Sequence, residues 1–337
     1  MYDAFKYFSE LDELTGTDTG EGEPAIEVCG LQRHFGAVVA VDGIDLCVQK
    51  GEIYGFLGPN GAGKSSVVRM LCTLLRPHGG TAKVAGYDVV RHPKAVRAHI
   101  GVALQEAALD DGQTGRELLA LQGRLYGMDR HQIRDRLARV LDLVDIGEGI
   151  DRRIGTYSGG MKRRLDLAAA LVHSPDVLFL DEPTTGLDPA SRSAVWSEIR
   201  RLNSDLKMTI FLTTQYLDEA DVLADRVGIL ARGRLVAEGS PQALKRSVGQ
   251  DLIVAEVEGS DASVVRSLEI LPGVDSVSAE RGRITVSTAD GAAGLVPVTL
   301  ALHDTMLNVR SLTVRTPTLD DVFRELTGSH MEMGASR

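Results

Sequence analysis

The nine residues Gly58-Pro59-Asn60-Gly61-Ala62-Gly63-Lys64-Ser65-Ser66 fit the pattern G-x-x-x-x-G-K-S/T, which is typical of loops that hold phosphate groups. The apolar run at 53–57 predicts a buried strand before the loop, and the run at 67–75 predicts a packed helix after it. Phosphate binding requires this strand-to-helix context. A glycine-rich turn that binds nothing would explain the glycines but not the spacing and the flanks.

In such a loop, backbone N–H groups converge on a β-phosphate, because unpaired donors and the positive end of the helix dipole favour an anion. Lys64 would reach the β- and γ-phosphates, and the Ser65 hydroxyl would be a ligand of Mg²⁺. The loop residues expected to contact nucleotide are Gly58, Asn60, Gly61, Ala62, Gly63, Lys64, Ser65 and Ser66.

The composition indicates a globular chain with more than one domain. The 337 residues exceed one ordinary domain, and 43% of them are hydrophobic. The net charge of -10 argues against a nucleic-acid binder, which usually presents a basic face. The three cysteines have neither metal-ligand nor C-x-x-C spacing, which favours a reduced, cytosolic compartment. No run approaches the roughly 20 apolar residues that cross a bilayer.

Three apolar runs predict buried strands that end in polar residues. They lie at 100–104, 177–180 and 208–213, and helices separate the last two, as in a parallel sheet. In α/β proteins, ligand contacts lie at such strand ends. The polar residues that follow the runs are Gln105, Asp181, Glu182 and Gln215.

The remaining segments predict three kinds of structure. Short β-rich pieces at 26–29, 38–41, 44–48 and 81–85 predict an antiparallel sheet. Residues 114–146 carry apolar side chains at helical spacing, which predicts a small helical insert. From about residue 250, the expected elements follow the order β-α-β-β-α-β of a ferredoxin-like domain, at 252–257, 262–269, 274–278, 283–287, 291–304 and 307–314.

A last helix is expected after Thr318, which can cap it together with Asp321. Its apolar side chains share one face, and they are Leu319, Val322, Phe323 and Leu326. For Phe323 we prefer packing within its own domain to a contact across subunits. At the other end of the chain, the acidic leader at 1–24 is either a disordered tail or a short docking helix, of which the tail is the preferred interpretation.

A second motif narrows the family, namely Gly155-Thr156-Tyr157-Ser158-Gly159-Gly160-Met161-Lys162-Arg163-Arg164-Leu165. Ser158 is expected to be an N-cap, and the two glycines after it would leave the helix N-terminus open to an anion. This stretch resembles the signature of ABC ATPases. The order of motifs also agrees, with the phosphate loop, Gln105, the signature, Asp181-Glu182, Gly186-Leu187-Asp188 and Gln215 spread over about 25–245.

This resemblance implies roles for individual residues. Asp181 would hold Mg²⁺ directly or through water, and Glu182 would polarise the attacking water. Gln105 would touch Mg²⁺ or that water and report the nucleotide state to a membrane partner. Two copies would pair head to tail around two ATP molecules. The signature residues facing the γ-phosphate of the opposite subunit would be Ser158, Gly159 and Gly160, and Asp188 is counted with the nucleotide-contacting residues.

Phe35 matches the position where the family stacks an aromatic ring on adenine, and packing in the core is the alternative. Gln215 stands where ABC ATPases usually have histidine. An amide can donate to the γ-phosphate but cannot titrate near neutral pH. Gln215 is therefore expected to act as a hydrogen-bond donor in catalysis beside Glu182 and Lys64.

The departures from the common pattern are similar to the daunorubicin/doxorubicin-resistance group of ABC exporter ATPases. They are Thr156-Tyr157-Ser158-Gly159-Gly160-Met161, Thr213-Thr214-Gln215-Tyr216-Leu217-Asp218-Glu219-Ala220-Asp221 and Pro317-Thr318-Leu319-Asp320-Asp321-Val322-Phe323. This similarity implies a peripheral subunit at the cytoplasmic face of the cell membrane that pairs with a separate permease and exports a hydrophobic, lipidic or drug-like compound.

We therefore expect an α/β P-loop ABC ATPase domain at 25–245, with a mixed sheet core, an antiparallel β subdomain and a helical subdomain at about 106–173. A small ferredoxin-like α+β domain follows at 250–328, and a tail at 329–337. The alternative is a soluble ABC-type ATPase that acts on DNA or ribosomes, against which stand the single cassette, the acidic charge and the missing heptad insertion. Import is a third possibility, and the C-terminal domain either regulates the dimer or only stabilises it.

Overall fold

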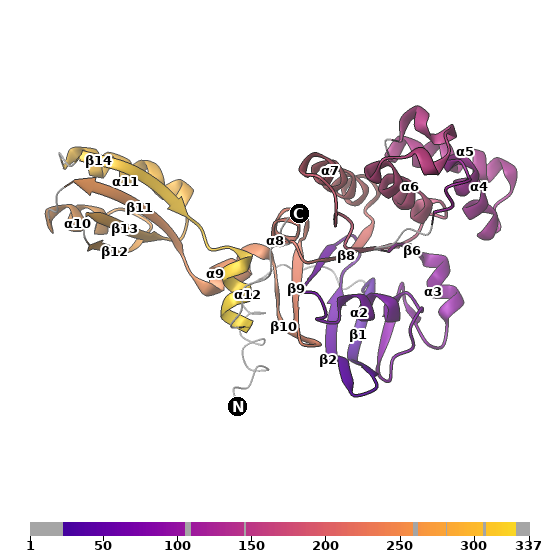
Figure 1. Ribbon diagram of the computed structural model, residues 1–337. Helices are drawn as coiled ribbons and strands as arrows, with labels where there is room; N and C mark the ends of the chain where they lie inside the picture. The colour runs from indigo at the N-terminus through magenta and orange to yellow at the C-terminus, as the bar shows by residue number, and fades with distance from the viewer. Residues whose placement is uncertain are drawn as a thin grey trace.

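The computed structural model describes residues 23–104, 109–144, 146–258, 262–280, 282–305 and 308–327. These residues form three sheets (Figure 1). Residues 1–22 of the leader predicted at 1–24, Gln105 and the tail at 329–337 lie outside the described residues. Within the described part of the chain, no helix is long and apolar enough to cross a membrane.

The central sheet has six strands in the order β10-β9-β3-β8-β7-β6. Strands β9, β3, β8, β7 and β6 run parallel, and β10 pairs antiparallel with β9. The apolar runs predicted as buried strands are confirmed, because β3, β7 and β8 are buried on both faces. The bounds are β3 Ile53–Leu57, β6 Ile100–Ala103, β7 Val177–Asp181, β8 Thr209–Thr214, β9 Arg226–Ala231 and β10 Arg234–Gly239.

The two faces of this sheet bury separate cores. On one face, Tyr54, Phe56, Phe179 and Phe211 pack against helix α2 (Lys64–Leu71), which an antiparallel sheet covers from the other side. On the other face, the alternate strand residues pack against helices α4 to α7. Alternation of side chains along each strand therefore places α2 and its phosphate loop between two sheets.

The antiparallel sheet has the order β2-β1-β4-β5 and confirms the predicted β subdomain. The two pieces predicted at 38–41 and 44–48 form one strand, because Gly43 adopts φ 71° and the register with β1 shifts there. A bulge at Gly43 bends strand β2 at the point where the sequence predicted a break between two strands. The bounds are β1 Ile26–Phe35, β2 Val38–Val48, β4 Gly79–Val84 and β5 Tyr87–Asp88.

The predicted helical insert is confirmed and contains two main helices. Gly127, at φ 78°, separates α4 from α5, and each helix begins with a capping box, Thr114 with Glu117 and Asp129 with Gln132. The helices of this region and its flanks are α3 Pro93–His99, α4 Gly115–Leu125, α5 Arg130–Leu143, η1 Gly147–Asp151, η2 Ile154–Thr156 and α6 Gly159–Leu171. Helices α7 Pro189–Leu206, α8 Leu217–Leu223 and α9 Pro241–Val248 follow along the chain.

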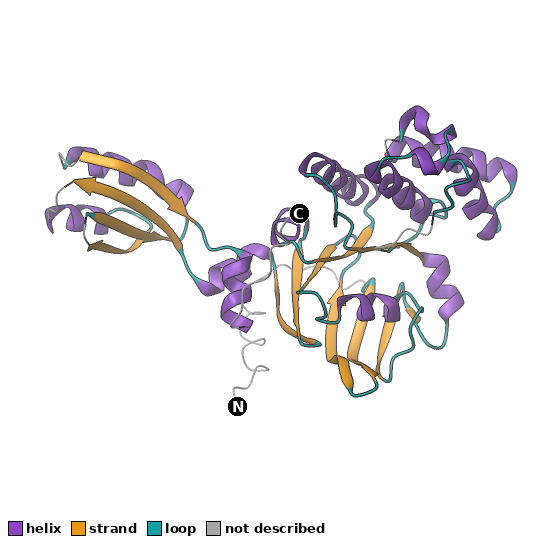
Figure 2. Cartoon of the chain, viewed as in Figure 1, coloured by secondary structure: helices purple, strands orange, loops and turns teal. Residues whose placement is uncertain are grey.

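The C-terminal sheet has the order β12-β13-β11-β14, and every neighbouring pair is antiparallel. Helices α10 and α11 pack against one face of it, which confirms the ferredoxin-like arrangement (Figure 2). The bounds are β11 Asp251–Glu258, α10 Ala262–Glu269, β12 Val274–Glu280, β13 Arg283–Thr288, α11 Gly291–Asp304 and β14 Asn308–Arg315.

The last helix, α12 (Leu319–Thr327), returns to the central sheet. Thr318 and Asp321 exchange the predicted capping hydrogen bonds, with Asp321 N–H donating to Thr318 Oγ1 at 3.2 Å. Phe323 is buried, but the preference for packing within its own domain was wrong, because it is buried with residues of the central sheet, among them Leu57 and Ile229. Leu326 is 44% exposed and lies at the edge of this contact. The ferredoxin-like sheet is therefore held at both ends by α9 and α12, which pack together (Figure 1).

Candidate functional site

The phosphate loop has a shape that only glycine permits at three positions. Gly61 and Gly63 have φ 79° and 112°, in the left-handed region that L side chains rarely adopt. A Cβ on Gly63 would lie 2.3 Å from Ala40 O, and one on Gly58 would lie 2.5 Å from Leu230 O. Gly63 is the N-cap of α2, so the loop leads directly into a helix N-terminus whose first N–H groups have no acceptor within the helix.

Lys64 lies almost completely buried at the start of α2 and faces the end of β7. Its Nζ donates to Gly58 O at 2.6 Å and to Pro59 O at 3.2 Å, and it pairs with Glu182 Oε1 at 3.3 Å. Burial lowers the pKa of Lys64, and the Glu182 carboxylate opposes this shift. The lysine is therefore held beside the loop as a cation whose nearest acid is Glu182.

Asp181 and Glu182 leave the end of β7 in different directions. Asp181 Oδ1 accepts from Thr213 Oγ1 and lies 3.5 Å from Ser65 Oγ, whereas Glu182 reaches Lys64. The change of direction arises at Glu182, which has φ 49° and whose N–H donates to Thr213 O at 3.1 Å. This strained backbone is stabilised from the neighbouring strand. One carboxylate thus faces the Ser65 hydroxyl and the other faces the lysine.

Gln215 follows β8 directly, one strand away from Asp181 and Glu182, and is partly buried. The turn that carries it is closed by Tyr216 N–H, which donates to Thr214 Oγ1 at 2.9 Å. Strand β6 ends at Ala103 beside β7, so the segment that leads to Gln105 starts from the same edge of the sheet. The polar residues that follow β3, β7 and β8 therefore gather at one edge, as parallel strands require.

The signature residues lie at the N-terminus of α6. Ser158 is the N-cap, and its Oγ accepts from Met161 N–H at 3.3 Å. Gly159 is exposed, and a Cβ there would meet nothing within 4 Å. Gly160 lies near Ser191 of α7, whose Oγ would be 3.6 Å from a Cβ. The end of this helix therefore presents free backbone surface to another molecule.

Asp188 and Phe35 take positions that their motifs alone did not specify. Asp188 caps α7, accepts from Ala190 and Ser191 N–H groups at 3.0 Å, and the hydrogen bond from Ser191 Oγ lowers its pKa. Phe35 is 46% exposed, which contradicts packing in the core. The Arg33 guanidinium lies over the exposed ring, 4.7 Å from its centroid.

Two threonines in β8 were missed by reasoning from the sequence. Thr213 holds Asp181 and the backbone of Glu182, and Thr214 closes the turn at Gln215. Both are completely buried, yet they stand at the end of an apolar strand. Buried hydroxyls need hydrogen-bond partners. A pair of threonines at the end of an apolar run could therefore have indicated that these side chains bind to neighbouring residues of the site.

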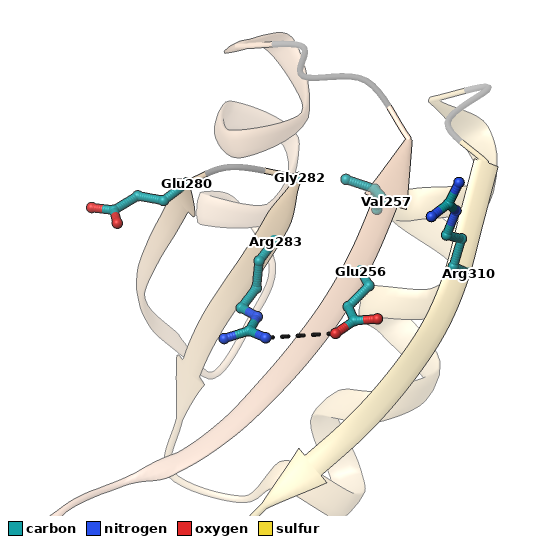
Figure 3. A pocket seen from close by; sticks show the side chains of 6 residues that line it. All are labelled: Glu256, Val257, Glu280, Gly282, Arg283 and Arg310. Atoms are coloured by element: carbon teal, nitrogen blue, oxygen red, sulfur yellow. Dashed lines mark ion pairs between the residues drawn. The ribbon is translucent and has the colours of Figure 1, made fainter.

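A hollow in the C-terminal sheet lies apart from these residues (Figure 3). Arg283 and Glu256 form an ion pair across it at 3.5 Å, and Arg310 of β14 stands on its other side. Arg283 and Glu256 are exposed to solvent, as are Arg310 and its partner Glu258. Exposed ion pairs of this kind contribute little to stability. The hollow brings together no group for nucleotide chemistry.

Comparisons with known proteins identify the family of this chain. One matching family model is described as ABC transporter and covers residues 41–185. A second, described as ATP-binding protein DrrA1-3-like, C-terminal domain, covers residues 239–327. The daunorubicin/doxorubicin resistance ATP-binding protein DrrA of Streptomyces peucetius is 47% identical over 90% of this chain and 92% of its own length. This chain belongs to the daunorubicin/doxorubicin-resistance family of ABC transporter ATP-binding proteins.

Other relatives of this ABC ATPase carry related names. The Nod factor export ATP-binding protein I of Rhizobium sp. (strain N33) is 39% identical over 91% of this chain and 98% of its own length. A solved ATP-binding subunit of an ABC transporter has 26% identity and a TM-score of 0.60, over 66% of this chain and 92% of that chain. The protein is thus an ATP-binding and ATP-hydrolysing ABC transporter ATPase.

Proposed function

We propose that this ABC ATPase is the motor subunit of an exporter that acts at the cytoplasmic face of the membrane. Two copies would pair head to tail, each phosphate loop facing the α6 N-terminus of the other copy, and their closure would drive a separate permease. The observation that carries the proposal is the meeting of Lys64, Ser65, Asp181 and Glu182 at one edge of the central sheet, with Ser158 and Gly159 exposed.

The residues of the site divide the work between binding and chemistry. Lys64 and the loop N–H groups would bind the β- and γ-phosphates, and Phe35 would stack on adenine. Glu182 would orient and activate the attacking water, and Gln215 would donate a hydrogen bond to the γ-phosphate. Gln105 is proposed to act beside them, and Asp188 to lie at the contact between copies. Because the backbone turns at Glu182, the Asp181 side chain points in a different direction and would act as a ligand of Mg²⁺.

The donor set beside the loop fits Mg²⁺. The Ser65 hydroxyl and the Asp181 carboxylate are hard oxygen donors 3.5 Å apart, and Gln105 would add an amide oxygen. When bound, Mg²⁺ would neutralise charge on the β- and γ-phosphates. Thr213, which hydrogen-bonds Asp181, would keep this carboxylate oriented toward Ser65.

The names of the relatives support export of a drug-like, hydrophobic or lipidic compound. They include resistance to daunorubicin and doxorubicin and export of Nod factor, and each such statement is made of those proteins. Their names favour an exporter over an ATPase that acts on DNA or ribosomes. Co-purification of the chain with a polytopic membrane protein, rather than with ribosomes, is the expected result of isolating it from its own cells.

The decisive test is Glu182→Gln. This variant should bind ATP and accumulate as a closed dimer, with turnover reduced by at least about a hundredfold, because water activation is lost while phosphate binding remains. Turnover and light scattering with ATP measure both effects. Glu52→Gln is the control, because it makes the same chemical change at a similarly buried acid on the opposite edge of the sheet. This variant should hydrolyse ATP at the parent rate and should still exchange between monomer and dimer. Normal turnover of Glu182→Gln would remove Glu182 from its proposed role.

A further inference from the structure

Glu219 is a completely buried acid that the proposed chemistry does not use. It lies on α8, and its Oε1 accepts from Thr184 Oγ1 at 2.8 Å and from Trp196 Nε1 at 2.9 Å. Its Oε2 is also buried, and the Thr214 side chain, next to Gln215, is a further hydrogen-bonding neighbour of the carboxyl group. Burial raises the pKa of Glu219, and its hydrogen bonds oppose this shift.

An acid in this environment is costly for folding. A buried carboxyl group loses its hydration, and an apolar side chain of similar volume would avoid that loss. The hydrogen bonds to Glu219 compensate only in part. A functional requirement therefore explains an acid at position 219 better than a gain in folding stability does. The neighbours of Glu219 indicate what that function is.

Glu219 and Thr184 belong to the two segments that carry the proposed reacting groups. Thr184 lies two residues after Glu182, at the end of β7. Glu219 itself lies four residues after Gln215, which follows the adjacent strand β8. The Glu219–Thr184 hydrogen bond is therefore a direct link between the loop of the proposed base and the helix that follows the switch position.

The second partner, Trp196, joins α7 to this link. Trp196 lies on α7, the helix that begins after Asp188, and donates to the same oxygen. Nearby, the Arg192 guanidinium of α7 lies over the Tyr216 ring at 4.4 Å and pairs with Asp218 at 3.5 Å. The turn at Gln215 is thus held against α7 from two positions.

We propose that Glu219 is a positioning residue for ATP hydrolysis, which keeps the Glu182 loop and the Gln215 turn in register through Thr184 and Trp196. The inference rests on the roles proposed for Glu182 and Gln215. Since small displacements of reacting groups reduce rates strongly, loss of the link should act on the chemical step. Nucleotide affinity should change little, because the phosphate loop and Phe35 are not partners of Glu219.

The test compares Glu219→Ala and Glu219→Gln. The alanine variant should lower kcat by about 10- to 100-fold with little change in KM for ATP. The glutamine variant should recover kcat close to the parent value, because its amide oxygen can accept from both Thr184 and Trp196. Trp196 is the single tryptophan of the sequence, so its fluorescence should change in Glu219→Ala and stay near that of the parent in Glu219→Gln.

Glu238 provides the matched control. It is another acid largely shielded from solvent in the central sheet, and it accepts from the Tyr54 hydroxyl at 3.0 Å, in a network with Arg226. Glu238→Ala should lower the melting temperature and leave kcat near the parent value, measured well below that temperature. Thr184→Val should reproduce the loss of kcat, and in a Glu219→Ala background it should add little further loss.

The outcomes separate this inference from the proposed function. If Glu182→Gln loses turnover but Glu219→Ala and Glu238→Ala have the same kcat, Glu219 is only structural and the inference fails. Equal losses of kcat in Glu219→Ala and Glu219→Gln would also overturn it, as would purely additive losses with Thr184→Val. If Glu182→Gln keeps its turnover, the proposed function fails first, whatever Glu219 does.

Discussion

At the scale of single residues, the site depends on how two adjacent carboxylates are aimed. An Asp-Glu pair at the end of a strand would point to opposite faces if the backbone stayed extended. The positive φ of Glu182 changes that direction and brings its side chain to Lys64, while Asp181 stays beside Ser65. Thr213 stabilises both conformations from β8. A metal role and a water role can therefore belong to neighbouring residues.

Gln215 leads to a prediction at the same scale. Gln215→Ala should slow hydrolysis by about 100-fold in kcat, because a donor to the γ-phosphate in the transition state is removed. Gln215→His restores a donor and adds a group that titrates near pH 6.5, so its kcat should vary with pH between about 5.5 and 7.5 more than that of the parent. Steady-state kinetics over this pH range measure both effects. An unchanged kcat in Gln215→Ala would exclude the proposed contact.

At the scale of elements, helix α12 has the least expected position. Its capping and its apolar face are readable from the sequence. Leu319, Val322 and Phe323 of this face are buried with residues of β3, α8, β9 and α9, in a cluster separate from the core of the ferredoxin-like sheet. Leu57, in this same cluster, is the last residue of β3 and precedes the phosphate loop. The end of the chain thus supports the strand from which the nucleotide site begins.

This packing predicts a large difference between two substitutions on one helix. Phe323→Ala should reduce the free energy of unfolding by about 3–5 kcal/mol, because it leaves a cavity between α12 and the central sheet. Leu326→Ala is the matched control, since Leu326 is 44% exposed, and its effect should stay below about 1 kcal/mol. Urea unfolding of both variants measures the difference. Equal effects would contradict the docking of α12 on the ATPase.

At the scale of the whole molecule, one copy holds both halves of the proposed binding interface on separate elements. The phosphate loop follows β3, whereas the signature begins α6, on the helical side of the central sheet. The exposed Gly159 and the exposed Asn60 give each half an accessible surface. A second copy in the opposite orientation would place each half against its complement.

Crosslinking between different chains tests this arrangement. Chains with Asn60→Cys, mixed with chains carrying Thr156→Cys, both with Cys29→Ser and Glu182→Gln, should crosslink through a short bifunctional reagent when ATP and Mg²⁺ are present. Both substituted positions are exposed, and Thr156 lies two residues before Ser158. Glu280→Cys, at an exposed position on β12, replaces Thr156→Cys in the control and should not link to Asn60→Cys. Failure of the first pair with trapped ATP would rule out the head-to-tail dimer.

The class of fold and the set of candidate residues could be predicted from the order of amino acids. The buried strands, the phosphate loop and the order of motifs depend on local spacing, because a strand or a helix N-terminus is specified by residues near one another in the chain. The same holds for the N-cap at Ser158, the capping of α12 and the ferredoxin-like order of elements. These predictions need no knowledge of distant partners.

Which surfaces meet could not be predicted in this way and became known from the folded chain. The exposure of Phe35, the position of Phe323 on the ATPase and the bonds of Thr213 and Glu219 join segments that lie far apart in the sequence. Amphipathic spacing predicts which face of an element is buried but not which neighbour covers it. The role of a buried acid depends on hydrogen-bond partners that other elements supply. The link between the Glu182 loop and the Gln215 turn exists because β7 and β8 are adjacent, and that adjacency is a property of the folded sheet.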